Sequence, residues 1–430
     1  MKSARALATK ATASVVYDRS TLEHALESSR SHPEFAFIRA LVTGSVRLWP
    51  RYEWMLKQLL QKPLAKKEKV LYCLLINGCC EVLDMTTPDY ATVNETVKAA
   101  MALKRLWARG LVNGVLRTLE RDKDRLGVAI LKQPAFVQLG YPQWLAASLV
   151  SDWGDRAESL LTDANSQAPL TLRLRSPGAR EQYSCSLKAE NIEFAFTEAS
   201  PLGITIQSKT EVHDLPGYHE GEFYVQDESP QLLAQLIEMA DGARVLDGCA
   251  APGGKTSLLL EQFPTIELVA VEPSRSRCER LRENLKRLKL SAQVCEADLR
   301  QLEDWWDERH FNCVILDVPC SGTGVIRRHP EIKRHRTLEQ IAELECLQRE
   351  LLEAAWSVLA PGGTLLYLTC SVLKRENDHQ MQWFLSRHSD AHQQPIELPQ
   401  GIRTEYGWQQ LIERDRGDGF YYAKLVKRQS

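Results

Sequence analysis

The C-terminal part of the chain, from residue 243 onward, alternates short apolar stretches with longer amphipathic ones. Stretches such as "LVAVE" (268–272) and "VILDV" (314–318) are almost continuously apolar, which is typical of strands buried on both faces. Segments such as "RCERLRENLKRL" (277–288) lie between them and carry apolar residues at helical spacing. This alternation predicts a Rossmann-like, doubly wound α/β fold with a mostly parallel sheet.

Two other textures precede this region, and 430 residues are enough for two or three domains. Residues 1–145 repeat apolar side chains every three or four positions and predict an all-α domain. Residues 146–235 contain strand-like stretches separated by Gly and Pro turns and predict a small α+β module. A helix is expected at the end of this module, over 231–240. Residues 236–430 then form the predicted α/β domain, with "GFYYAKLVK" as its last edge strand.

Composition excludes several classes of protein. The 11 cysteines are scattered and include no C-x-x-C pair, so we expect neither a disulfide framework nor a bound metal. The longest apolar stretch, residues 70–83, is interrupted by Asn77 and Glu81 and is too short to span a membrane. The sequence therefore predicts a cytoplasmic chain with a buried helix at this position and no membrane partner.

The predicted strands end on chemically capable side chains. These residues are Asp247, Glu272, Asp298, Asp317 and Cys370. Ligands of a doubly wound sheet bind outside the carboxyl ends of its strands. A single acid at such a position could be a helix cap, but the whole set predicts a binding site.

The first strand is followed by "DGCAAPGGKT", residues 247–256. Gly253 and Gly254 would allow a ligand to approach the backbone closely, but the turn matches neither the dinucleotide nor the triphosphate motif. Glu272 could accept hydrogen bonds from ribose hydroxyls, and Asp298 could accept one from an adenine amino group. This set suits S-adenosyl-L-methionine, although an acid after the second strand would also suit NAD and a dehydrogenase.

The segments "DVPCSGTG" and "TCS" bring Asp317, Cys320 and Cys370 to one pocket. Methylation of cytosine carbon 5 needs a thiolate that adds to carbon 6, an acid at ring nitrogen 3 and a base that removes the carbon 5 proton. Two thiols and an aspartate meet these needs. The residues alone do not decide which thiol is the nucleophile.

Basic residues are concentrated at two places, although the net charge is −2. Residues 98–125 are rich in Lys and Arg, and "RRHPEIKRHR" (327–336) directly follows the second cysteine motif. We expect both regions to contact RNA phosphates. The expected contacts in the second are Arg327, Arg328, His329 and Lys333.

At these motifs the chain resembles the RNA 5-methylcytosine methyltransferases, in particular those that act on bacterial 16S ribosomal RNA. The resemblance is carried by "DGCAAPGGKT", "DVPCSGTGVIRRHPEIK", "LAPGGTLLYLTCSVLKREN" and "GDGFYYAKL". The segments "NETV" and "RGLVNGVLR" are similar to a NusB-like RNA-binding domain. The resemblance thus covers nearly the whole chain and is weakest between residues 150 and 220.

The resemblance also implies residue roles. Cys370 would be the nucleophile, Cys320 would assist release of the product, and Asp317 would contact both cofactor and cytosine. The further cofactor contacts would be Cys249, Ala250, Ala251, Pro252, Gly253, Gly254, Lys255, Glu272 and Asp298. Gly248, Glu272 and Ala297 depart mildly from the family pattern.

The implied partner is RNA and not DNA, and the chain is expected to be a monomer. Two alternatives stay open. One is a cytosine-5 methyltransferase for transfer RNA with the same core, and the other is an RNA-binding ribosome or transcription factor with a vestigial catalytic fold. The target nucleotide is not determined by the sequence.

Overall fold

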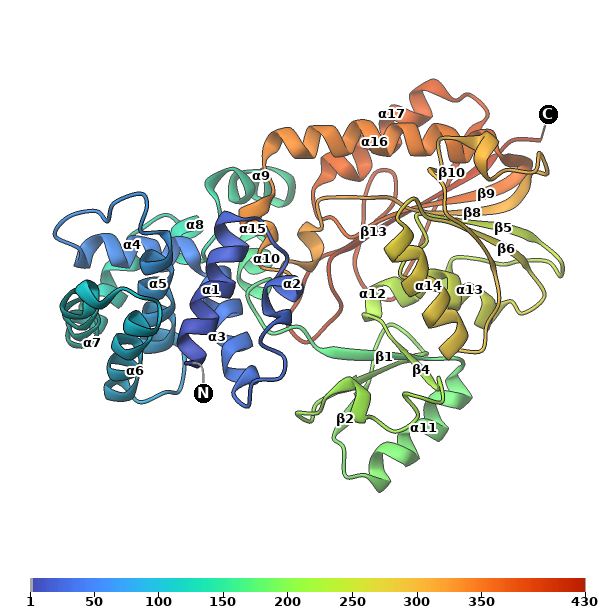
Figure 1. The fold of residues 1–430 in the computed structure, drawn as a ribbon. Coiled ribbons are helices and arrows are strands. Elements are labelled where there is room, and N and C mark those ends of the chain that lie inside the picture. Colours follow the sequence, from blue (N-terminus) through green and yellow to red (C-terminus); the bar gives the residue numbers. More distant parts are fainter. Residues whose placement is uncertain (1–2, 430) are drawn as a thin grey trace. The chain divides into compact units, whose positions relative to one another are not determined.

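The computed structural model describes residues 3–429, which fold as two compact units. The first comprises the chain up to Asn165 together with Ile326–Arg336, and the second comprises Ser166–Val325 and the chain from Thr337. In Figure 1 the first unit is mainly blue to cyan-green and the second mainly green to red. Among the described residues, no helix is both long and apolar enough to cross a bilayer.

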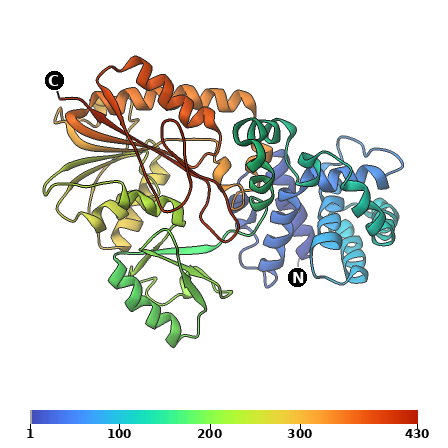
Figure 2. The same cartoon turned by 180° about the vertical axis from the view of Figure 1, so that it is seen from behind.

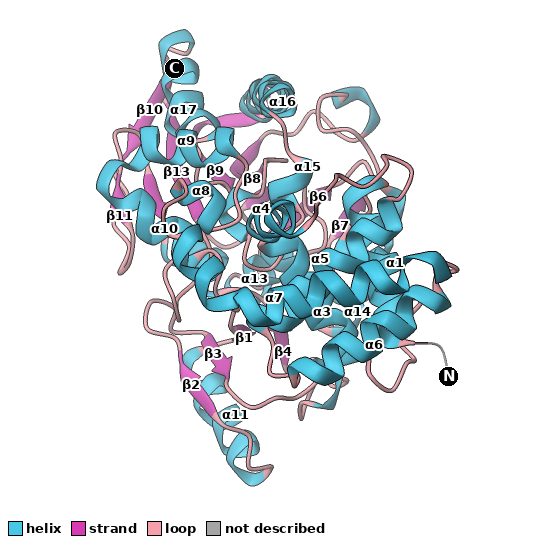
Figure 3. Cartoon of the chain, turned by 90° about the vertical axis from the view of Figure 1, so that its left-hand side faces the viewer, coloured by secondary structure: helices cyan, strands magenta, loops and turns pink. Residues whose placement is uncertain are grey.

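The first unit is built from helices, as the three- and four-residue spacing predicted (Figure 3). Its helices are α1 (Ala4–Tyr17), α2 (Leu22–Glu27), α3 (Phe35–Arg47), α4 (Trp49–Leu59), α5 (Lys69–Asp84), α6 (Asp89–Ala102), α7 (Arg109–Ile130), α8 (Ala135–Gln138), α9 (Gln143–Trp153), α10 (Ala157–Asp163) and α15 (Ile332–His335). Helix α5 is the expected buried helix. Two of its buried polar residues have partners inside the unit, because Glu81 pairs with Arg5 and Asn77 Oδ1 accepts from Thr12.

The helical unit extends past the expected boundary at residue 145. Helices α9 and α10 continue from α8, which packs against α4. The unit also includes residues 326–336, which sequence order alone assigned to the α/β domain. The boundary therefore follows the packing of the helices.

The second unit begins with the predicted α+β module, coloured green in Figures 1 and 2. Strands β1 (Leu170–Leu174), β2 (Phe194–Phe196), β3 (Gly203–Ile206) and β4 (Phe223–Val225) form an antiparallel sheet in the order β2-β3-β1-β4. Helix α11 (Pro177–Ala189) contributes Tyr183 and Leu187 to the same apolar cluster as Leu172 and Ile204. The helix expected over 231–240 is reduced to α12 (Glu228–Gln231) and a 3-10 turn (Leu232–Gln235). Residues 236–240 are irregular, while Leu233 and Ile237 still pack into the core.

A larger sheet makes up the rest of the second unit. Its strands are β5 (Arg244–Gly248), β6 (Glu267–Val271), β7 (Gln293–Cys295), β8 (Phe311–Asp317), β9 (Leu359–Thr369), β10 (Ala391–Gln394), β11 (Ile402–Arg403), β12 (Trp408–Gln410) and β13 (Phe420–Lys427). The order is β11-β12-β13-β9-β8-β5-β6-β7, with β10 also paired to β13. Strands β5 to β9 run parallel and β13 is antiparallel to β9. The prediction that β13 is an edge strand is wrong, because β12 and β10 pair with its other side.

Helices cover both faces of this sheet, which confirms the doubly wound fold. Helices α13 (Gly254–Gln262) and α14 (Arg275–Arg287) pack into one apolar cluster with Val245 and Ile315. Helices α16 (Leu338–Ser357) and α17 (Asp378–Arg387) pack into the other with Leu246 and Val314. Neighbouring residues of one strand thus point to opposite faces.

Candidate active site

The acids and thiols predicted from the strand ends do meet at one edge of the sheet. Strand β5 lies between β6 and β8, and β8 lies beside β9. Asp247 is the second-last residue of β5, and Asp317 is the last residue of β8. Glu272 directly follows β6, and Cys370 directly follows β9. Because these strands are parallel and adjacent, their side chains share one edge.

The backbone of the turn after β5 has the conformation of a loop that a ligand can approach closely. Cys249 has φ +63° and Gly253 has φ +100°, and the peptide before Pro252 is cis. A Cβ atom at Gly253 would lie 2.5 Å from Leu281 Cδ1, so both conformation and space favour glycine there. The Gly253 amide donates to the Ala250 carbonyl at 2.9 Å. Helix α13 then begins at Gly254, and its first amides face the site end of the sheet.

Side chains from outside the motif hold the carbonyl groups of this turn. Arg173 of β1 donates to Gly254 O at 2.6 Å, and Arg277 of α14 donates to Ala251 O at 2.7 Å. Asn284 and Tyr224 both donate to Pro252 O, at 3.0 and 3.3 Å. The sequence motifs did not identify these residues. The one signal in the sequence was the charge of Arg173 inside the otherwise apolar strand "LTLRL", because a buried arginine needs hydrogen-bond acceptors.

Glu272 has a buried carboxylate oxygen that could accept a further hydrogen bond. It is fully buried, and its Oε1 accepts from the Ser274 amide at 3.1 Å. Its Oε2 lies 3.2 Å from the Arg277 guanidinium but has no aligned hydrogen bond. A buried carboxylate oxygen without a donor is unfavourable, and a ligand with a pair of hydroxyl groups would satisfy it.

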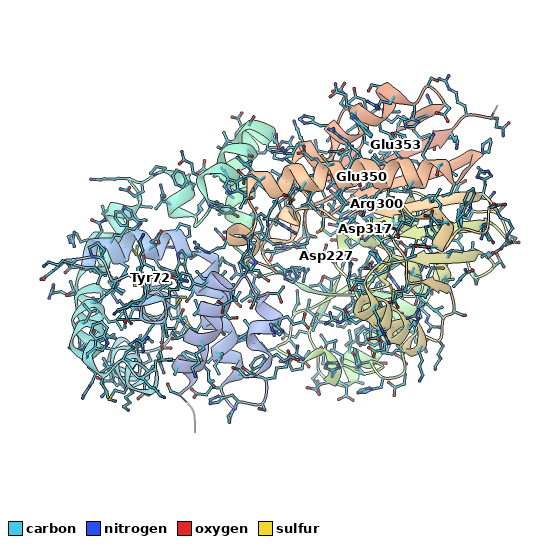
Figure 4. The ribbon with its side chains drawn as sticks, turned by 45° about the horizontal axis from the view of Figure 1, so that its top comes forward. Tyr72, Asp227, Arg300, Asp317, Glu350 and Glu353 are labelled. Atoms are coloured by element: carbon cyan, nitrogen blue, oxygen red, sulfur yellow. The ribbon has the colours of Figure 1, made fainter. Side chains whose placement is uncertain are left out.

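Asp298 is already engaged by its neighbour. Both of its carboxylate oxygens accept from the Arg300 guanidinium, at 2.6 to 3.2 Å, and Arg300 also binds Glu350 of α16 (Figure 4). The hydrogen bonds from Arg300 lower the pKa of Asp298. An additional partner of Asp298 would have to share its oxygens with Arg300.

Two charged groups meet between the turn and β8. The Lys255 ammonium donates to Asp317 Oδ2 at 2.5 Å (Asp317 is labelled in Figure 4). Burial alone would lower the pKa of Lys255, but the Asp317 carboxylate outweighs it and raises that pKa. Asp247 is fully buried behind this pair, and burial raises its pKa to about 7 although Thr256 donates to it at 2.6 Å.

The two thiols of the motifs lie next to each other. Cys320 Sγ and Cys370 Sγ are 3.3 Å apart, and both residues are partly exposed. The hydrogen bond with Cys370, burial and the charge of Glu376 raise the pKa of Cys320 well above its usual value. Burial likewise raises the pKa of Cys249, so that thiol stays neutral.

The basic segment after the cysteine motif differs from what the sequence predicted. Arg327 and Lys333 are buried, with 1% and 3% of their surface exposed. The Lys333 ammonium donates to Asn165 Oδ1 at 2.6 Å and to Arg47 O at 3.2 Å, and it lies over the Tyr141 ring. These two side chains stabilise the helical unit and are not available to phosphates in this conformation. Arg328 is partly exposed and His329 is exposed. Of the four side chains expected to contact RNA phosphates, these two are the accessible ones.

The basic residues between 98 and 125 are mostly exposed, but several have acidic neighbours. Arg121 and Arg125 both bind Asp122, and Arg117 binds Glu120. Exposed ion pairs contribute little free energy, so a phosphate could replace these partners. Residues 3–429 contain no cluster of His, Cys, Asp or Glu that could hold a metal ion.

Three family descriptions match the chain. "16S rRNA methyltransferase RsmB/F" matches residues 234–426, "NusB family" matches 2–121, and the ferredoxin-like domain of RsmF/B-like methyltransferases matches 141–213. Two relatives are named ribosomal RNA small subunit methyltransferase B. The protein from Pseudomonas syringae pv. tomato is 40% identical over 98% of this chain and 96% of its own length. The protein from Yersinia enterocolitica is 39% identical over 99% and 98%.

Solved structures share the fold. The crystal structure of PH0851 has a TM-score of 0.82 at 21% identity and covers 99% of both chains. A methyltransferase homolog protein from Pyrococcus horikoshii has a TM-score of 0.60 at 25% identity and covers 70% of this chain and 99% of its own. The resemblance expected from the motifs is confirmed, and the chain belongs to the RsmB/F family of 16S rRNA methyltransferases.

Proposed function

We propose that the protein transfers a methyl group from S-adenosyl-L-methionine to carbon 5 of a cytosine in 16S ribosomal RNA, through a covalent bond between Cys370 and carbon 6. The observation that carries this proposal is the 3.3 Å separation of the Cys320 and Cys370 sulfurs at the strand ends. The rRNA part rests on the family, since relatives that span the whole chain are named small-subunit rRNA methyltransferases.

The cofactor part is supported by the fit of the cleft residues. Glu272 would bind the ribose hydroxyls, because its buried Oε2 has no hydrogen bond. The turn from Cys249 to Lys255 would lie against the rest of the cofactor, with Asp298 and Asp317 as further contacts. S-adenosyl-L-methionine supplies an activated methyl group, and the electrons of the broken methyl–sulfur bond stay on that sulfur. A solved structure with the same fold is described as NSun6 with SFG, at 19% identity and a TM-score of 0.59.

Charges around the thiols favour Cys370 as the nucleophile. The pKa of Cys320 is raised well above its usual value, and the hydrogen bond with Cys370 is the largest cause. The Lys255 ammonium lies near Cys370, since a negative charge on that sulfur is among the causes that raise the pKa of Lys255. A cation near a thiol favours the thiolate. The residues alone did not rank the two cysteines, and this asymmetry supports the ranking that the family resemblance implied.

The proposed reaction begins with attack of the Cys370 thiolate on carbon 6. The electrons of the 5,6 double bond shift toward ring nitrogen 3, which takes a proton from the Asp317–Lys255 pair. Carbon 5 then takes the methyl group. An unpaired cytosine is required, since a base in a duplex cannot reach the sulfur.

Release of the product needs a base at carbon 5, and Cys320 lies close enough to serve. Once Cys370 is bonded to carbon 6 it has no charge, so the largest cause of the raised pKa of Cys320 is removed. Cys320 can then lose its proton to solvent and take the proton from carbon 5. The electrons of that C–H bond restore the double bond, nitrogen 3 returns its proton, and Cys370 leaves as a thiolate.

Separate serine variants of the two cysteines test this proposal. Purified Cys320→Ser protein should accumulate a covalent complex with 16S rRNA on a denaturing gel, whereas Cys370→Ser should form none and should not methylate. Cys346→Ser, which changes an exposed cysteine of α16, is the matched control and should behave as wild type. The assignment is wrong if Cys320→Ser loses the complex while Cys370→Ser retains it.

Bisulfite sequencing tests the substrate. RNA from a deletion strain should lack one methylcytosine in 16S rRNA and regain it when the wild-type gene is restored. Loss of a methylcytosine from transfer RNA alone would contradict 16S rRNA as the substrate.

A further inference from the structure

A buried carboxylate lies directly beneath the two thiols. Glu376 ends a 3-10 turn (Lys374–Glu376) and is fully buried. Its Oε1 accepts from the Ser321 amide at 2.7 Å, and its Oε2 accepts from the Ser321 and Ser371 hydroxyls at 2.5 and 2.6 Å. Ser321 directly follows Cys320, and Ser371 directly follows Cys370. One side chain therefore binds the residue after each thiol.

Neighbouring groups make this arrangement rigid. Gln348 of α16 donates to Glu376 Oε1 at 3.1 Å and to the Pro319 carbonyl at 3.0 Å. Thr323 Oγ1 lies 3.1 Å from Ser371 Oγ and accepts from the Val372 amide at 3.1 Å. A fully satisfied buried polar network of this kind has one arrangement. It fixes the two cysteine loops relative to each other.

The charge of the Glu376 carboxylate acts on the pKa of one of the two thiols, Cys320. This charge is among the causes that raise the pKa of Cys320. Cys370 and Tyr367 are further titratable groups near Cys320, and burial raises the pKa of Tyr367 far enough to keep it neutral. The Lys255 ammonium, which is paired with Asp317, lies near Cys370, because a charge on that sulfur acts on the pKa of Lys255. The Glu376 carboxylate thus acts on Cys320, and the cation of an ion pair lies near Cys370.

We propose that Glu376 is a positioning residue for methyl transfer, which holds the Cys320 and Cys370 loops together and places a negative charge near Cys320. This inference rests on the proposed roles of the two thiols. Glu376 touches neither substrate nor cofactor and acts only through Ser321, Ser371 and its charge.

The test is Glu376→Gln, which keeps the size of the side chain and removes its charge. Asp378→Asn is the matched control, since Asp378 is a mostly buried carboxylate on the same segment that accepts from Thr404 and Tyr421 instead. We expect Glu376→Gln to slow single-turnover methyl transfer to 16S rRNA by about 10- to 100-fold, the effect of small displacements of reacting groups. Asp378→Asn should stay within about threefold of wild type, since its side-chain partners Thr404 and Tyr421 are not shared with Glu376.

A second readout separates positioning from mere support of the fold. In a Cys370→Ser background without RNA, the alkylation rate of Cys320 by iodoacetamide is followed against pH by mass spectrometry of its peptide. Glu376→Gln should move the inflection to lower pH by roughly one unit, a shift of ordinary size for a protein thiol. Because this measurement needs neither RNA nor methyl donor, it gives a result even if the proposed function fails.

Two serine variants cover the case in which Glu376→Gln does not fold. Ser321→Ala and Ser371→Ala each remove one of the hydroxyl bonds to Glu376 but leave its charge. They should therefore slow transfer by roughly 10-fold without moving the alkylation inflection. The proposal is overturned if Glu376→Gln folds and leaves the inflection in place. It is also overturned if both serine variants transfer methyl groups at the wild-type rate.

Discussion

Arg173 links the small α+β module to the turn after β5, and the cost of removing Arg173 can be worked from its contacts. Its side chain is 0% exposed, and it donates to Gly254 O and Gln226 Oε1 at 2.6 Å and to Ser257 Oγ and Glu261 Oε2 at 2.9 Å. Glu261 is itself only 4% exposed. Arg173→Met would therefore leave a buried carboxylate without its main cation.

Loss of one partner of a buried ion pair costs about 3–5 kcal/mol. Arg175 lies 3.7 Å from the other oxygen of Glu261 but is 43% exposed, so it compensates only in part. We expect the free energy of unfolding to fall by about 3 kcal/mol. For a unit of this size that corresponds to a decrease in Tm of roughly 6–12 °C.

Thermal unfolding followed by circular dichroism measures this effect, and titration calorimetry of S-adenosyl-L-methionine at 20 °C measures the effect on the turn. The folded variant should bind the cofactor more weakly, because the Gly254 carbonyl loses its tether. Arg173→Met with Glu261→Gln should recover part of the lost stability, since the remaining partner no longer has a charge. A Tm within about 2 °C of wild type, or a double variant less stable than the single one, would refute this reasoning.

Three further predictions concern other parts of the molecule. Burial raises the pKa of Asp247 to about 7, above its value in an unfolded chain, so the stability that this group contributes is present at pH 4 and is lost as pH rises through 7. Asp247→Asn should become more stable relative to wild type over that range in urea unfolding, and a constant difference would contradict it. Gly324→Ala should abolish methyl transfer, because its Cβ would lie 2.1 Å from Gly419 O and 2.8 Å from Cys370 O; wild-type turnover would contradict this. Lys333→Met should change thermal stability but not the affinity for 16S rRNA in filter binding, and a loss of affinity would show that Lys333 does reach phosphates.

The motifs and the hydrophobic pattern determined the fold class and the place of the site. Continuously apolar strands between amphipathic helices can be buried only in a covered parallel sheet, and residues that end such strands meet at one edge. Asp247, Glu272, Asp317 and Cys370 were therefore found from local sequence, and Cys320 from the loop that follows β8. The helical character of the first unit followed from its periodicity in the same way.

Only the tertiary structure decided which of these groups interact and which basic residues are exposed. Arg173 and Glu376 lie far in sequence from the turn and from Cys320, and no local pattern indicates a hydrogen bond across 81 or 55 residues. Lys333 belongs to a basic run, yet it is buried, because residues 326–336 pack into the helical unit and its ammonium finds carbonyl acceptors there. Charge, burial and proton position at the two thiols depend on these long-range contacts, since electrostatic effects are set by distance and surroundings and not by order along the chain.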